Sequence, residues 1–231
     1  ITHTLRFILK KAKIALIIDD FGYSQGSTVD SFLKEIDAPL TISIIPGTPY
    51  VNSIAREAHK QGKEVMVHLP MQPKGEFKNS YKWIILEKMK DKEIEDIVNE
   101  AIEDVPYAVG LNNHMGSLIT TQKKPMEDVL KIVKRKKLYF LDSKTDADSI
   151  ALALAKEMGV KSTKREIFLD NEKDKDYIKK QIGKLIFIAE KKGEAVGTAH
   201  INPVTSQAIK ESLSKLNNKK IQLVYASEIV D

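Results

Sequence analysis

The sequence contains no cysteine and few arginines, and both scarcities narrow the possible functions. Without cysteine the chain forms no disulfide, no zinc ribbon and no thiol nucleophile. Only four of its 37 basic residues are arginine, whereas proteins that grip phosphates favour the planar guanidinium. The lysines alternate with acids along helical segments, so we attribute the net charge of +5 to lysines on solvated helix faces. We therefore expect no nucleic-acid partner.

Several familiar sequence features are also missing. No apolar run approaches the roughly 20 residues of a membrane span, and no Gly-rich phosphate loop, GxSxG elbow or HExxH helix is present. The chain opens on Ile1-Thr2-His3 and not on methionine. We therefore expect residues 1–12 to be an N-terminal extension, the remnant of a leader or anchor, followed by one domain over residues 13–231.

What the sequence does have is an alternation of short apolar segments with helical patterns. The strand candidates are rich in Val, Ile and Leu and apolar on both faces, as buried parallel strands are. They are 14–18, 40–45, 64–69, 108–112, 138–141, 160–163, 194–200 and 221–225. The helical patterns lie between them, at 28–36, 51–61, 92–103, 126–136, 149–158, 177–192 and 206–216.

This alternation predicts an α/β fold with seven or eight parallel strands in a single barrel-like domain. An open, doubly wound sheet is the alternative. The segment from Pro70 to Trp83 interrupts the rhythm with prolines, lysines and aromatics. It is either a loop that shapes a binding site or a simple surface excursion.

Five of the strand candidates run directly into polar residues. In a parallel barrel the carboxyl ends of all strands lie on one face, and that face holds the active site. Residues far apart in the sequence should therefore meet there. These residues are Asp19-Asp20, His68, Asn112-Asn113-His114, Asp142 and His200. Two adjacent carboxylates with several imidazoles are typical of a metal-centred hydrolase.

Each polar group also has a simpler interpretation. Asp19 and Asp20 would cap a helix or loop, unless one binds a cation while the other acts as a general base. His68 and His114 would be ordinary core histidines, unless they join a carboxylate as ligands. A catalytic zinc ion takes three protein ligands and keeps one position open, although other divalent ions accept the same donors. The residues alone do not choose among these ions.

The remaining polar positions have weaker assignments. His200 is favoured as the acid that protonates a leaving group, with a fourth ligand or a structural residue as alternatives. Asp142 either orients an imidazole or caps the segment 143–145. We expect Arg165 and Asp170 to form an ion pair at the rim, and Asn113 to hydrogen-bond backbone or substrate. A barrel-type phosphoesterase is a third and weaker functional hypothesis, because arginine is scarce.

Five motifs together resemble the divergent polysaccharide deacetylase family. They are IIDDFGY at 17–23, HLPMQP at 68–73, GLNNHMGS at 110–117, FLDSKT at 140–145 and FLDN at 168–171. Their order and spacing match over nearly the whole chain, from about Lys13 to Val230. The resemblance implies a distorted (β/α) barrel and the removal of acetyl groups from chitin-like or peptidoglycan sugars.

The resemblance also implies roles for individual residues. Asp19 resembles the base, His200 the acid, and Asp20, His68 and His114 the ligands of a divalent metal, with zinc the favoured ion. Asn113, Asp142, Arg165 and Asp170 are placed among groups that support the ligands or contact substrate. The partner implied is a polysaccharide or oligosaccharide, and the implied location is extracytoplasmic, in the periplasm or at the cell surface.

The chain departs from the usual deacetylase pattern in three places. His68 stands alone, where a His-x-x-x-His-type segment usually supplies both imidazoles. No Arg-Pro-Pro-Tyr segment is present, and Ile201 follows the last histidine where proline is usual. A non-catalytic glycan-binding or envelope protein that keeps the fold is therefore the alternative function.

Overall fold

Nine short strands form one entirely parallel sheet in the computed structural model, which describes residues 11–218 and 220–231. Eight of them follow the order β6-β5-β4-β3-β2-β1-β8-β7, and β9 pairs with β1. The strands are β1 (Ala12–Phe21), β2 (Thr41–Ile44), β3 (Glu64–Met71), β4 (Ala108–Met115), β5 (Tyr139–Asp142), β6 (Ser162–Lys164), β7 (Ile167–Phe168), β8 (Glu194–His200) and β9 (Ile221–Val224).

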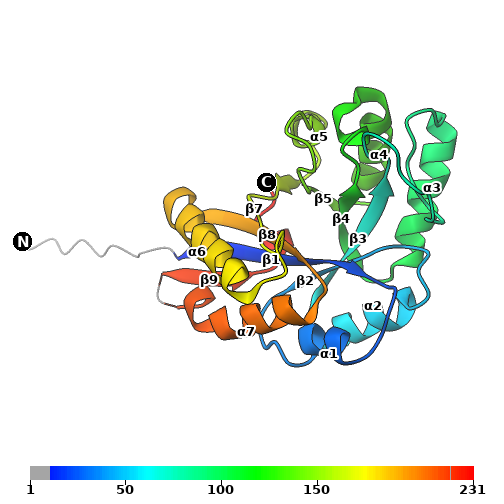
Figure 1. The fold of residues 1–231 in the computed structure, drawn as a ribbon. Helices are drawn as coiled ribbons and strands as arrows, with labels where there is room; N and C mark the ends of the chain where they lie inside the picture. Colours follow the sequence, from blue (N-terminus) through cyan, green and yellow to red (C-terminus); the bar gives the residue numbers. More distant parts are fainter. Residues whose placement is uncertain (1–10, 219) are drawn as a thin grey trace, which may run out of the picture.

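This order confirms the predicted barrel. The first six strands neighbour one another in sequence order, whereas a doubly wound sheet reverses direction near its middle. The sheet curls into a half-barrel, whose two ends, β6 and β7, are consecutive in the chain (Figure 1). Of the predicted extension 1–12, residues 1–10 lie outside the described part of the chain, and Ala12 already begins β1.

Helices cover the outer face of the curled sheet. They are α1 (Ser27–Leu33), α2 (Val51–Lys60), α3 (Asp91–Asp104), α4 (Lys123–Arg135), α5 (Ala151–Glu157), α6 (Lys175–Lys192) and α7 (Pro203–Leu216), with short 3-10 turns η1 (Ile119–Thr121) and η2 (Ala226–Glu228). In Figure 1, α6 and α7 pack side by side on one flank of the sheet, and α3 and α4 on the other. Within the described residues, no helix is both long and apolar enough to cross a bilayer.

Alternate residues of the buried strands feed two separate cores. Ile14, Leu16 and Ile18 of β1 join the large core beneath the helices. Ala15 and Ile17, which point the opposite way, join a smaller core inside the curl. Because side chains alternate between the faces of a strand, β1 is buried on both faces over its apolar stretch from Ile14 to Ile18.

The segment from Val224 to Ile229 completes the inner core. Val224, Ala226 and Ile229 pack against apolar side chains of β1, β3, β5 and β8. The backbone of Ala226 donates to the Thr41 hydroxyl at 3.1 Å, and the backbone of Ser227 donates to Glu64 at 3.2 Å. The segment therefore closes the inside of the half-barrel at the amino ends of its strands.

β4 and β5 pack closely at Gly110, which lies opposite Tyr139 in the sheet. A Cβ atom at Gly110 would lie 2.3 Å from the ring of buried Tyr139. We expect Gly110→Ala to destabilise the protein by about 1–3 kcal/mol, as overpacked cores do. Urea unfolding measures the change. The matched control is Gly183→Ala in α6, where a Cβ meets open space, so about 0.5–1 kcal/mol of stabilisation is expected there. Equal stabilities for the two variants would contradict this packing.

Candidate metal centre

Asp20 occupies an irregular position at the end of β1. The pairing of β1 with β2 changes register between Ile18 and Phe21, and Asp20 has a φ of 68°. Residues other than glycine seldom adopt this left-handed conformation, although Asp and Asn tolerate it best. The irregularity separates the side chains of Asp19 and Asp20, so that two adjacent carboxylates have different surroundings. Strain of this kind is often retained at functional sites.

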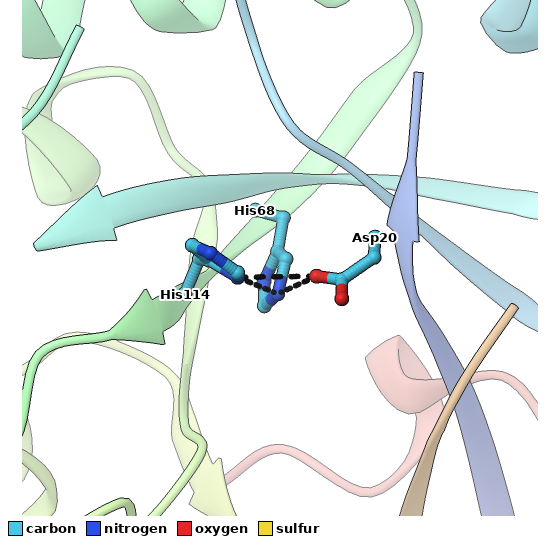
Figure 2. A group of neighbouring side chains, drawn as sticks. All are labelled: Asp20, His68 and His114. Carbon is cyan, nitrogen blue, oxygen red and sulfur yellow. Dashed lines mark hydrogen bonds and ion pairs between the residues drawn. The ribbon is translucent and has the colours of Figure 1, made fainter. Parts of the chain in front are cut away.

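Three side chains from three strands, Asp20, His68 and His114, converge at this point, as Figure 2 shows. Oδ1 of Asp20 lies 3.3 Å from Nε2 of His68 and 3.1 Å from Nδ1 of His114. The two imidazole nitrogens are 3.1 Å apart. His68 and His114 come from the paired strands β3 and β4 and are offset by two residues in register, so they share one face of the sheet and their rings meet edge to face.

This cluster fits a divalent cation. Oδ1 of Asp20 is buried and accepts no hydrogen bond of good geometry, a costly state for a carboxylate oxygen unless another group compensates. Neighbouring ligand atoms in a tetrahedral zinc site are about 3.4 Å apart, close to the three separations found here. One carboxylate and two imidazoles form a donor set typical of catalytic metal sites.

The charges of the cluster are strongly coupled. Burial raises the pKa of the Asp20 carboxyl, but the contacts with His114 and His68 outweigh burial and hold that pKa well below its usual range. Burial lowers the pKa of His68, yet Asp19 and Asp20 together raise it above its ordinary value. For His114 burial dominates, and its pKa is lowered. The carboxylate of Asp20 is therefore ionised and ready to act as a ligand.

Asp19 lies beside this cluster and not within it. Its side chain is buried, and Oδ1 accepts a hydrogen bond from Nδ2 of Asn112 at 2.9 Å. The same oxygen lies 3.6 Å from Nδ1 of His68, on the opposite side of the ring from Asp20. The pair Asp19-Asp20 thus divides into one carboxylate within the imidazole cluster and one that contacts the other nitrogen of His68 and lines the cavity beside the cluster.

His200, at the end of β8, approaches the cluster from the other side. Its Nε2 lies 3.7 Å from Oδ2 of Asp20, and its Nδ1 lies 3.3 Å from Oδ1 of Asp170. Contact with Asp170 raises the pKa of His200 above its ordinary value, although burial opposes the shift. Three donors fix the other oxygen of Asp170: the backbone N–H of His200, the amide of Asn202 and the hydroxyl of Thr205.

The expected ion pair between Arg165 and Asp170 is not formed within the described residues, because Asp170 faces His200. Arg165 instead donates to the carbonyl of Lys144 at 3.0 Å and lies over the ring of Phe168. Burial lowers the pKa of Arg165, while the nearby Asp19 and Asp142 raise it. The positive guanidinium group of Arg165 therefore offsets the negative charge of Asp19 and Asp142, although among the described residues it forms no ion pair with either.

Asp142 and Asn113 shape the backbone around the site. Asp142 accepts from the backbone of Lys144 at 2.8 Å and from the hydroxyl of Ser149 at 2.7 Å, so it caps its own loop and orients no imidazole of the described chain. Asn113 donates to the carbonyl of Met115 and accepts from the backbone of Ser143. It thereby ties the end of β4 to the end of β5.

The cluster opens into a cavity of about 340 Å³. Its wall combines the imidazole cluster with polar, aromatic and methionine side chains at or just beyond the carboxyl ends of seven strands, β1 and β3 to β8. These residues are Asp19, His68, Asn113, His114, Met115, Ser143, Thr145, Arg165, Phe168 and His200. The cavity is wide enough to admit a single sugar or acyl-amide group.

The sequence interpretation missed one residue of the site, Tyr81, whose hydroxyl lies 2.8 Å from Nε2 of His114. It placed Asn112 at this face without its specific contacts, and the structure shows that Asn112 bridges Asp19 and His68. Partners of this kind orient metal ligands and fix their tautomers. Tyr81 lies in the segment from Pro70 to Trp83, which was predicted to shape a site or merely to project from the surface. Its aromatic and lysine content gave no sign of this contact.

The fold and the site have counterparts in known proteins. The sequence model of the family described as "Divergent polysaccharide deacetylase" matches residues 16–230. A relative in Escherichia coli (strain K12), the uncharacterized protein YibQ, is 34% identical over 219 residues, which are 95% of this chain and 67% of that protein.

Two solved structures show where the fold recurs. The uncharacterized protein ATU2773 from Agrobacterium tumefaciens superposes with a TM-score of 0.91 at 20% identity, over 96% of this chain and 90% of that one. The catalytic domain of a peptidoglycan N-acetylglucosamine deacetylase from Eubacterium rectale gives 0.51 at 15% identity, over 95% and 91%. At these identities the likeness concerns the fold.

Proposed function

The chain belongs to the divergent polysaccharide deacetylase family, and from this premise we propose that it is a metal-dependent hydrolase that removes N-acetyl groups from a polysaccharide. The observation that carries the proposal is the convergence of Asp20, His68 and His114, with Asp19 behind them and His200 opposite. Family membership alone would be compatible with a protein that only binds glycans. Asp19 and His200, two further ionisable groups beside the proposed ligands, favour catalysis over binding alone.

The proposed reaction is the hydrolysis of an acetamide. Water adds to the acetyl carbonyl, the bond between carbon and nitrogen breaks, and acetate and a free amine leave in equal amounts. Asp20, His68 and His114 would hold the cation, and zinc is the ion we propose because two imidazoles with one carboxylate recur in catalytic zinc sites. Such a cation supplies Lewis acidity and promotes the ionisation of water.

The chain's own residues would move the protons. Asp19 accepts a proton from the attacking water, a role suited to a carboxylate beside the ligand cluster and outside it. His200 donates a proton to the departing amine. Its contact with Asp170 keeps the imidazole protonated to a higher pH than usual, and so preserves the acid form near neutrality. Because the reaction needs an acetylated amino sugar, we propose a cell-envelope glycan as substrate and an extracytoplasmic location.

Release of acetate tests the proposal. We expect zinc-loaded protein to liberate acetate and amine in a ratio of one from N-acetylated chitin oligosaccharides or peptidoglycan fragments, and chelation to abolish this release. The ratio distinguishes an amide from an ester. Protein shown to contain metal that releases no acetate from either glycan would contradict the proposal. Glycan binding without turnover would favour the alternative of a binding protein.

The contact between Asp170 and His200 predicts a pH effect. Contact with Asp170 raises the pKa of His200, and the acid role needs the protonated ring, so activity should fall as the pH rises through that pKa. We expect Asp170→Asn to lower this pKa and to move the alkaline limb of the kcat profile to lower pH. NMR titration of His200 measures the same shift without turnover. The control is Asp146→Asn, a surface carboxyl paired with Lys74, and identical profiles for wild type and Asp170→Asn would remove His200 from the acid role.

A further inference from the structure

Asn112, on β4, is wholly buried and contacts three other strands of the barrel. Its Oδ1 accepts from the hydroxyl of Ser43 on β2 at 2.7 Å and lies 2.7 Å from Nδ1 of His68 on β3. Its Nδ2 donates to Oδ1 of Asp19 on β1 at 2.9 Å. One amide thus links the carboxylate beside the site to an imidazole within it.

The chemistry of these partners fixes which way the amide faces. An ionised carboxylate only accepts hydrogen bonds, so the NH₂ group of Asn112 must face Asp19. The amide oxygen must then face Nδ1 of His68, and this nitrogen must carry a hydrogen to donate. A neutral ring with hydrogen on Nδ1 keeps the lone pair of Nε2 free. Nε2 is the atom that faces Asp20 and His114.

Among the residues that the structure describes, no other contact of His68 replaces this one. The next acceptor near Nδ1 is Oδ1 of Asp19 at 3.6 Å, beyond the range of a useful hydrogen bond. Ser43 does not contact the ring but holds the amide oxygen in place. The orientation of His68 therefore depends on one side chain, which is itself anchored at both ends.

We infer that Asn112 is a positioning residue that transmits the orientation set by Asp19 to His68 and keeps Nε2 of His68 available as a ligand atom. This inference rests on the proposed metal site, but not on the substrate or on turnover. It assigns to Asp19 a part in organising the site in addition to its proposed part as base. It also explains why an amide, and not an apolar residue, occupies this fully buried position within β4.

The test combines NMR of the His68 ring with zinc affinity. Long-range ¹⁵N–¹H spectra should show hydrogen on Nδ1 of His68 both in the zinc-loaded protein and in metal-free protein at alkaline pH, where the ring is neutral. Asn112→Leu keeps the size of the side chain but removes both polar contacts. We expect it to weaken zinc binding by about 10–100-fold, as loss of a ligand's supporting partner does.

Two further variants separate the two ends of Asn112. Asn112→Asp keeps an acceptor for His68 but replaces the donor to Asp19 with a second carboxylate. The added negative charge attracts the cation and offsets the repulsion between the carboxylates, so zinc affinity should stay within about tenfold of wild type while the Leu variant falls further. Ser43→Ala, the matched control, should leave hydrogen on Nδ1. Two results would overturn the inference: a neutral His68 ring in metal-free wild type at alkaline pH that carries its hydrogen on Nε2 and not on Nδ1, or equal zinc affinities for wild type and the Leu variant.

These readouts also separate this inference from the proposed function. If the Leu variant fails to fold, the spectra of wild type and of Asn112→Asp still show whether Asn112 places the hydrogen on Nδ1 of His68. If wild-type protein binds zinc and releases no acetate, the proposed function fails, while the tautomer and the affinity series remain valid tests of Asn112. If wild type takes up no zinc, the metal site fails, and the metal-free spectrum still shows whether Asn112 sets the tautomer.

Discussion

Replacing Asp20 with asparagine should weaken zinc binding by at least about 100-fold, and hydrolysis should be lost with it. The substitution removes one of three proposed ligands and leaves two neutral imidazoles, which hold a dication far less well than a set with a carboxylate. Asparagine has nearly the shape of aspartate and tolerates the left-handed backbone at this position. A loss of zinc affinity in this variant therefore results from the missing negative charge and not from a rearranged backbone. Competition with a chelating dye measures the affinity.

The control for this experiment is a carboxylate outside the site. Asp30→Asn removes an exposed acid that pairs with Lys34 on the same helix, and such pairs contribute at most about 1 kcal/mol. It should bind zinc as wild type does. Wild-type zinc affinity in the Asp20→Asn variant would show that Asp20 is no ligand, and the metal site would have to be sought elsewhere.

Replacing Asp19 with asparagine should have the opposite pattern: zinc is retained and turnover is lost. Asp19 lies on the far side of His68 from the ligand cluster, and an asparagine oxygen there still accepts from Asn112. A general base contributes about 10²–10⁴-fold to the rate, so kcat should fall by that factor while the zinc content stays near that of wild type.

Together the two aspartate variants test the division of labour between adjacent carboxylates. Loss of zinc in one and loss of turnover in the other would support separate roles. An Asp19→Asn variant that binds zinc and keeps the wild-type kcat would contradict the role of Asp19 as base and would place the base elsewhere in the cavity. A fall in zinc affinity in that variant comparable to that of Asp20→Asn would instead make Asp19 a ligand.

Most of the fold could be predicted because buried parallel strands carry an unmistakable pattern. The predicted strand over 194–200 coincides with β8, and that over 14–18 lies inside β1. β7 was missed because it has only two residues, Ile167 and Phe168, too few for any period to show. The positions at which strands end could not be predicted to the residue, for another reason. β1 and β4 continue for three residues beyond positions 18 and 112, through the polar residues found there, because backbone pairing continues whatever the side chains are.

The site was only partly predictable, and the missing part has a physical reason. Strand ends that carry acids and imidazoles are visible in a sequence, because parallel topology brings those ends together. Whether Asp170 would pair with Arg165 or with His200 depends on side-chain directions, which no spacing reveals. Asn112 was noticed as a polar neighbour of His114, but its hydrogen bonds to β1, β2 and β3 exist only in three dimensions.

The placement of the segment from Val224 to Ile229 inside the curl has a consequence for synthesis. A ribosome releases β1 through β8 before this segment emerges, so during translation the inner face of the sheet lacks the side chains that finally cover it. Outer helices such as α2 and α3 can dock earlier, because their partners are already made. The inner core can therefore close only when this short apolar stretch, which follows in the chain every strand that it packs against, has been made.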